Sequence, residues 1–299
     1  MENFIIIISY LFIGMGLRRV PRFPDETANV FNLYVIYVCL PALALLKIPG
    51  LEFSSQLLAP VIMPWVMLVF SGIVILAAAW VFKWDKGTTG ALMLLIPMGN
   101  TSFLGIPMVR AFMGDAGVPY AVIYDQLGSF LALSTYGTFI LAYYGGGEKV
   151  SMGEITQRII TFPPFIALML AACVFRFVEY PQPVVVLLKS LASTLVPVVM
   201  IAVGFQLKLK LSPEAWKPLG VGLCVKLVVA PLAALGLCRL FDLNGLAVNV
   251  SIFEAGMPPM ISAGAVAILA GLSPPLTAGL VGFGIVASFV TLPILHSLF

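Results

Sequence analysis

Long apolar runs, separated by short polar or turn-forming stretches, follow one another along the whole chain. A bilayer core of about 30 Å is crossed by roughly 20 helical residues. The runs therefore predict an all-α polytopic membrane protein with ten transmembrane helices and no inserted soluble domain. The predicted spans are, in order, Phe4–Leu17, Val30–Ile48, Leu57–Phe82, Thr88–Met113, Val118–Tyr144, Ile159–Val178, Val184–Phe205, Ala215–Leu240, Leu246–Ala270 and Pro274–Leu298.

The overall composition points the same way. Hydrophobic residues make up 61% of the 299 residues, charged residues make up 10%, and the mean hydropathy is +1.09. Because a soluble domain carries about 25% charged residues, we expect this chain to lie in the lipid bilayer. The net charge is only +3, and the 16 Lys and Arg residues are scattered along the chain instead of clustered. No basic surface for nucleic acid is therefore expected.

The basic residues of the loops predict an orientation. Cytoplasmic loops of membrane proteins carry an excess of Lys and Arg, and this rule places the first loop in the cytoplasm, with both termini on the other side of the cell or inner membrane. Four basic residues then face away from the cytoplasm: Lys47, Arg110, Arg176 and Arg239. Ten face it: Arg18, Arg19, Arg22, Lys83, Lys86, Lys149, Arg158, Lys208, Lys210 and Lys217.

The spans divide into two halves of five. Residues 1–144 form the first half, residues 145–157 a short cytoplasmic linker, and residues 158–299 the second half. A shift of 156 residues places Pro41 on Pro197, Gly128 on Gly284 and Thr135 on Thr291. Because each half has an odd number of spans, the two copies must be inverted relative to one another.

The fourth span of each half is interrupted at a matching place. Pro97–Pro107 breaks span four, and Phe253–Pro259 breaks span nine. Inverted repeats with matched broken spans are typical of secondary transporters, whose sites lie at the breaks near the middle of the membrane. The alternative is that Gly and Pro are simply tolerated in membrane helices.

A few polar side chains lie at or near these breaks. Asn100 and Thr101 lie at the first break and Glu254 at the second, while Asp125 and Lys226 lie within spans five and eight. A charged side chain at membrane depth normally has a partner, a bound ion or a proton. Glu254 could instead be held by backbone N–H groups, and Lys226 could be a structural counter-ion.

Both breaks resemble motifs of a known family. Gly99-Asn-Thr-Ser-Phe-Leu-Gly-Ile-Pro107 resembles the Gly-Asn-Thr-x-Phe-Leu-Gly-x-Pro signature of bacterial members of the auxin efflux carrier family, and Glu254-Ala-Gly-Met-Pro-Pro259 resembles its second signature. The resemblance implies the fold of auxin exporters, bile-acid transporters and sodium/proton antiporters. In that fold spans 1, 2, 6 and 7 form a scaffold, spans 3–5 and 8–10 form a moving transport domain, and the broken helices four and nine cross.

Two departures separate the chain from plant members of that family. It lacks their long central loop, and it carries the acidic Glu254 where they have none. Bacterial relatives are associated with organic anions such as malate and malonate.

The leading hypothesis is an elevator-type secondary transporter of a small organic anion, either auxin-like or a dicarboxylate. Glu254, Asp125 and Lys226 are its candidates for coupling to a proton or cation, with a possible sodium ion near Asn100 and Glu254. No other cofactor is expected, and a homodimer through the scaffold is possible. The candidate substrate-binding residues are Gly99, Asn100, Thr101, Ser102, Gly256, Met257, Pro258 and Pro259.

Other functions stay open at this stage. Sodium- or proton-coupled transport of a bile-acid-like or amino-acid substrate is one alternative, and a channel or receptor is another. An intramembrane enzyme is disfavoured. Tyr124-Asp125 resembles half of an aspartyl protease pair, but the partner Gly-x-Gly-Asp is missing, as is a His-Glu-x-x-His zinc motif.

Overall fold

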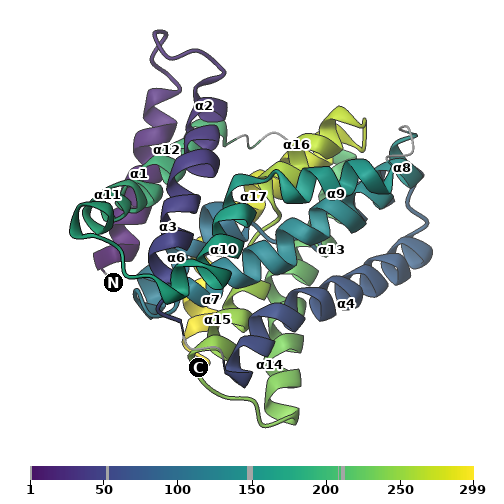
Figure 1. Ribbon diagram of the computed structural model, residues 1–299. Coiled ribbons are helices and arrows are strands. Elements are labelled where there is room, and N and C mark those ends of the chain that lie inside the picture. The colour runs from purple at the N-terminus through teal and green to yellow at the C-terminus, as the bar shows by residue number, and fades with distance from the viewer. Residues whose placement is uncertain (1, 52–53, 147–150, 208, 210–212) are drawn as a thin grey trace. The chain divides into compact units, whose positions relative to one another are not determined.

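A computed structural model describes residues 2–51, 54–146, 151–207, 209 and 213–299 (Figure 1). Throughout these residues the regular elements are helices, and the only β-type pairing among them is an isolated antiparallel bridge between Gly99 and Pro259. The expectation of an all-helical membrane protein is confirmed at this level. Part of the predicted linker, Gly147 to Val150, lies outside the described residues. So do Lys208 and Lys210, two of the basic residues that predict the orientation.

Five of the described helices are long and apolar enough to cross a membrane. They contain α2 (Thr27–Tyr34), η1 (Val35–Cys39), α3 (Leu40–Lys47), η2 (Ser55–Leu57), α4 (Leu58–Phe82), α11 (Gln182–Ser193), α12 (Leu195–Gln206), η7 (Pro213–Ala215), α13 (Trp216–Cys224), η8 (Val225–Val229), α14 (Ala230–Leu240) and α17 (Pro274–His296). The remaining predicted spans correspond to shorter or interrupted helices, so the count of ten stays a prediction.

The predicted sixth span, Ile159–Val178, is not one straight helix. The chain forms α9 (Met152–Ile160) and α10 (Pro163–Cys173), bent by 64° where they meet. Phe162 precedes Pro163 and adopts an extended backbone with ψ 115°, as expected because a residue before proline avoids the α region. The helix α9 also takes in residues 152–157, which the sequence assigned to the linker.

The chain forms two compact units. Unit 1 consists of Met1–Ser54, Ser102–Val122 and Thr156–Leu207, and unit 2 consists of Ser55–Thr101, Ile123–Ile155 and Lys208–Phe299.

Unit 1 is organised around a close pair of helices. The helix α1 (Glu2–Leu17) packs along α12, and α3 packs against α10 and α11 (Figure 1). A Cβ on Gly14 would lie 2.1 Å from the carbonyl oxygen of Ile201, and one on Gly204 would lie 2.0 Å from that of Leu11. The two backbones therefore touch directly, as small residues allow in membrane helix pairs. The short helix α6 (Ile106–Met113) contacts α1 in the same unit.

Unit 2 surrounds a buried apolar core. The helix α5 (Lys86–Leu95) lies at its centre, and Leu92, Leu94 and Leu95 are fully buried there. The helices packed around it include η5 (Leu133–Gly137), α8 (Thr138–Gly145), α13, α16 (Ile261–Leu269) and α17. The helix α4 contacts α5 and also η4 (Tyr124–Phe130) and α15 (Leu246–Ala255).

Both predicted interruptions occur in the structure. The helix α5 ends at Leu95, and helical structure resumes only with η3 (Thr101–Gly105). Likewise α15 ends at Ala255, and α16 begins at Ile261. Proline and glycine in both gaps explain the breaks, because proline removes a backbone donor and glycine weakens a helix.

Candidate functional site

The two interruptions pair with each other inside unit 2. The backbone N–H of Asn100 donates to the carbonyl of Pro258 at 2.7 Å, and that of Met260 donates to the carbonyl of Met98 at 3.2 Å. Gly99 and Pro259 form the antiparallel bridge between these two bonds. The pairing satisfies backbone groups that would otherwise be costly at membrane depth.

A buried carboxylate lies beside this pairing. Asp125, on the π-helical segment η4, is 1% exposed. Its Oδ1 accepts a 2.5 Å bond from Thr101 Oγ1, and its Oδ2 accepts a 2.6 Å bond from Gln126 Nε2. Both oxygens are thus held by neutral donors, and one of these donors is part of the first break.

Gln126 is a site residue that the sequence reasoning missed. Its side chain is 2% exposed, and its amide fixes the orientation of Asp125. Its position next to Asp125 in an otherwise apolar run could have predicted this role. A side-chain amide is rarely buried without a polar partner, and Asp125 is the nearest one in the sequence.

A buried lysine reaches the second break. Lys226, on the π-helical segment η8, donates from Nζ to the carbonyl of Ala255 at 3.2 Å. That carbonyl belongs to the C-terminal end of α15, where a helix has unpaired carbonyls and negative partial charge. A Cβ on Gly99 would lie 3.3 Å from the same Nζ, so the glycine leaves room for the ammonium group.

Glu254 is the most deeply buried charged side chain of the site. It is 0% exposed, and neither of its carboxylate oxygens has a hydrogen-bond partner among the described residues. The alternative that backbone N–H groups hold this carboxylate is therefore not what the structure shows. Asp125 and Lys226 both lie close enough to interact with it electrostatically.

An unbonded carboxylate in this position is expensive. Burial without hydrogen bonds disfavours the charged form strongly, and the C-terminal end of α15 adds repulsion from the helix dipole. A positive charge or a proton relieves both costs, and the Lys226 ammonium lies close enough to supply part of that charge.

The remaining predicted residues differ in where they lie. Met257, Pro258 and Pro259 are buried at the second break, while a Cβ on Gly256 would meet Leu295 Cδ2 at 2.8 Å, which indicates a packing constraint. Ser102 belongs to unit 1 and is described only within it. The structure therefore brings together Gly99, Asn100, Thr101, Asp125, Lys226, Glu254, Met257, Pro258 and Pro259.

Comparison with known proteins covers nearly the whole chain. Residues 1–296 match the family model described as "Membrane transport protein". An uncharacterized transporter of Methanocaldococcus jannaschii is 30% identical over 271 residues, covering 86% of this chain and 85% of that protein. An uncharacterized transporter of Methanothermobacter thermautotrophicus is 26% identical over 300 residues, covering 98% of this chain and 96% of that protein.

A third relative carries a substrate in its name. It is a protein of Rhizobium meliloti provisionally named a malonate transporter, 25% identical over 232 residues and covering 74% of this chain and 71% of that protein. The family and the names of the relatives describe transporters rather than enzymes. This chain belongs to the membrane transport protein family, the family of the auxin efflux carriers, and is a multi-pass membrane transporter.

Proposed function

We propose that this protein is a secondary active transporter of a small organic anion, with a dicarboxylate such as malonate as the leading substrate class. The single observation that carries the proposal is Glu254, a fully buried carboxylate without hydrogen bonds next to two paired helix breaks. Paired breaks and an acidic side chain at membrane depth are features of secondary transporters. The relative named for malonate transport supports the substrate class.

In this proposal the substrate carboxylate binds at the first break. Asn100 offers its side-chain amide there, and the N-terminal ends of η3 and α16 carry positive partial charge. Thr101 contributes as the first residue of η3, because its hydroxyl proton is donated to Asp125. Gly99, Gly256, Met257, Pro258 and Pro259 complete the proposed lining within unit 2.

Glu254 carries the coupling ion in the same proposal. A proton or a sodium ion on Glu254 would relieve its burial, and Asp125 and Lys226 tune the site through their charges. The bond from Lys226 to Ala255 favours the proton, because the ammonium already contacts a helix C-terminal carbonyl of the kind that would coordinate sodium.

We further propose an elevator movement, with inverted five-helix repeats over residues 1–144 and 158–299. Unit 1 holds predicted spans 1, 2, 6 and 7 and the start of span five, up to Val122, and unit 2 holds spans 3, 8, 9 and 10 and the rest of span five, which supports a division into scaffold and transport domain. Span four is divided between the units at Thr101 and Ser102, so the boundary of the moving part is proposed to pass through that break. A homodimer through the scaffold and non-cytoplasmic termini complete the proposal.

The test is Glu254→Gln, which keeps the size of the side chain and removes its charge. Purified protein in proteoliposomes should take up labelled malonate in the wild type and should lose coupled uptake in this variant. Glu179→Gln is the matched control, because Glu179 is exposed in a loop. Wild-type uptake with unchanged ion dependence in Glu254→Gln would refute the proposal.

A further inference from the structure

Unit 1 contains a cavity whose lining includes none of the residues that pair the two helix breaks. Its volume is about 450 Å³, within the usual range for small-molecule sites. The helices α1, α6 and α12 supply most of its walls. The lining includes charged, hydroxyl-bearing and proline side chains: Tyr10, Pro107, Arg110, Asp115, Ser193 and Pro197.

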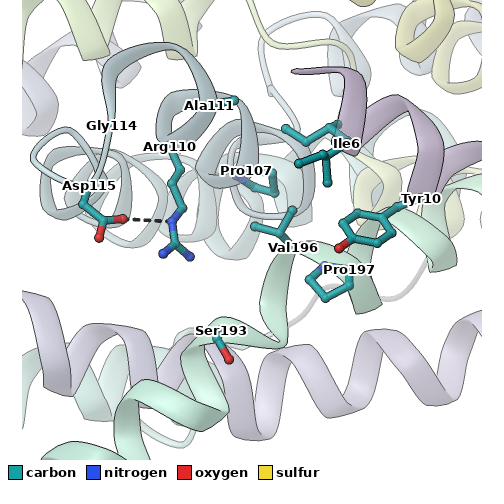
Figure 2. A pocket seen from close by; sticks show the side chains of 11 residues that line it. Ile6, Tyr10, Pro107, Arg110, Ala111, Gly114, Asp115, Ser193, Val196 and Pro197 are labelled. Carbon is teal, nitrogen blue, oxygen red and sulfur yellow. Dashed lines mark ion pairs between the residues drawn. The ribbon is translucent and has the colours of Figure 1, made fainter. Parts of the chain in front are cut away.

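Arg110 and Asp115 form a charged pair on one side of this cavity, and Tyr10 and Pro197 lie on another (Figure 2). Arg110 Nε lies 2.8 Å from Asp115 Oδ1, and Lys47 Nζ lies 3.2 Å from Asp115 Oδ2. Two positive groups thus share one carboxylate, and the cluster keeps an excess positive charge.

The Arg110 guanidinium is only partly used by this pair. Its contact with Asp115 is made through Nε, and Figure 2 shows the two terminal nitrogens pointing away from that carboxylate. A guanidinium has five N–H donors in a planar fork that matches the two oxygens of a carboxylate. The outward edge of Arg110 is therefore available to a second carboxylate.

The ion pairs are also open to exchange. The side chains of Arg110 and Asp115 are 41% and 54% exposed, and that of Lys47 is 25% exposed. Ion pairs with this much solvent contact contribute little to stability, so another anion can displace Asp115 from Arg110.

The backbone fixes Asp115 in this place. The helix α6 ends at Gly114, whose φ of 74° lies in the left-handed region that favours glycine. The N–H of Gly114 donates to the carbonyl of Arg110 at 3.1 Å, and the turn brings Asp115 back to the side chain of Arg110. The carboxylate is therefore built in beside the arginine.

We propose that this cavity binds a carboxylate of a small organic anion, with Arg110 as its anchor and Asp115 as an internal competitor for the same cation. Tyr10 and Ser193 offer hydroxyl groups to the polar end of the acid, while Pro107, Val196 and Pro197 contact its carbon chain. Of its lining residues, Pro107 alone belongs to the predicted first break, Pro97–Pro107. The proposal rests on organic-anion transport as the function of the protein and adds a second anion site to it.

The test is malonate binding to the purified full-length protein, measured by thermal stabilisation at matched ionic strength. The uncharged diamide of malonate serves as the ligand control, and Lys189→Gln serves as the protein control because Lys189 is exposed on α11 outside the cavity. Arg110→Gln should weaken malonate binding by about tenfold, the effect of losing one charged hydrogen-bonded contact. Asp115→Asn should strengthen it, because the competing carboxylate is gone.

The opposite signs separate a binding role from a structural one. If the ion pair only stabilised the fold, Arg110→Gln and Asp115→Asn would both lower stability and would leave malonate affinity unchanged. That result would overturn the proposal, as would wild-type protein that responds equally to malonate and to the diamide. If Arg110→Gln does not fold, the malonate affinity of Asp115→Asn decides alone: a higher affinity than wild type supports the site, and an unchanged or lower affinity overturns it.

The two proposals fail in different ways. Loss of coupled uptake in Glu254→Gln together with unchanged malonate affinity in Arg110→Gln and Asp115→Asn would remove the second site and keep the transporter. Malonate binding that depends on Arg110 in a protein that transports no malonate would remove the transport proposal instead.

Discussion

At the scale of single residues, Asp85 shows how the chain positions the core helix of unit 2. Asp85 precedes α5, and its Oδ1 accepts a 3.0 Å bond from the backbone N–H of Thr88. Hydrogen bonds from the side chain and backbone of Thr88 hold the pKa of this carboxyl below its usual value of 3.8. The ionised form is therefore the one that caps the helix.

Asp85→Ala should lower the free energy of unfolding by about 1 kcal/mol at neutral pH, the usual cost of losing an N-cap. Because the folded-state pKa is depressed, this contribution is fully present above the unfolded pKa of about 4 and is lost as the pH falls through the folded value. Thermal unfolding in detergent across that range checks it, with Asp85→Asn as the variant that keeps a capping oxygen without the titration. A difference between wild type and Asp85→Ala that does not shrink at low pH would contradict this role.

Residue chemistry also explains which site residues could be predicted. Glu254 and Asp125 are conspicuous in the sequence because carboxylates are rare in apolar runs. Their partners are less predictable. Lys226 donates to a carbonyl 29 residues away, and Thr101 reaches Asp125 across 24 residues. Such pairings depend on how helices pack, which the spacing of residue types along one helix does not encode.

At the scale of elements, the pair α1 and α12 depends on two glycines. Gly14 and Gly204 each lie against a carbonyl of the opposite helix, and no flexible side chain stands between them that could move aside. Gly16 lies on the same helix as Gly14, and a Cβ added to Gly16 would meet nothing within 4 Å. The chain thus offers a matched control two residues away.

Gly14→Ala or Gly204→Ala should destabilise unit 1 by about 1–3 kcal/mol or more, because the added methyl group forces the two backbones apart. Gly16→Ala should be neutral or stabilising, since alanine favours a helix by roughly 1 kcal/mol over glycine. Thermal unfolding of the three variants in one detergent measures both effects. Equal stability of Gly14→Ala and Gly16→Ala would show that the helices do not pack this closely.

The elements themselves were largely predictable. The apolar runs anticipate α4 and α17 to within a few residues, and Gly and Pro mark both helix breaks. The bend between α9 and α10 was missed, although Pro163 signals it, because a long apolar run outweighed a single proline. The π-helical turns at η3, η4 and η8 have no comparable sequence signal. They carry Thr101, Asp125 and Lys226, which fits the tendency of π-helical turns to occur at functional sites.

At the scale of the whole molecule, the few charged residues fall into two sets with different meanings. Most charged residues lie in loops and predict orientation, whereas Asp125, Lys226 and Glu254 are buried near the paired breaks. A protein that only needed to be stable in lipid would gain nothing from an unbonded buried carboxylate. The proposed coupling role gives such a group a purpose, because a proton or cation would bind to it and leave it during transport.

The most direct test of secondary active transport is accumulation of labelled malonate against its own gradient in proteoliposomes. A proton gradient and a sodium gradient are imposed in turn, each with an ionophore that collapses it. We predict saturable accumulation above the external concentration with one gradient, most directly the proton gradient, and its loss when the ionophore is added. Malonate flux that only equilibrates, or that is unaffected by either gradient, would contradict the account.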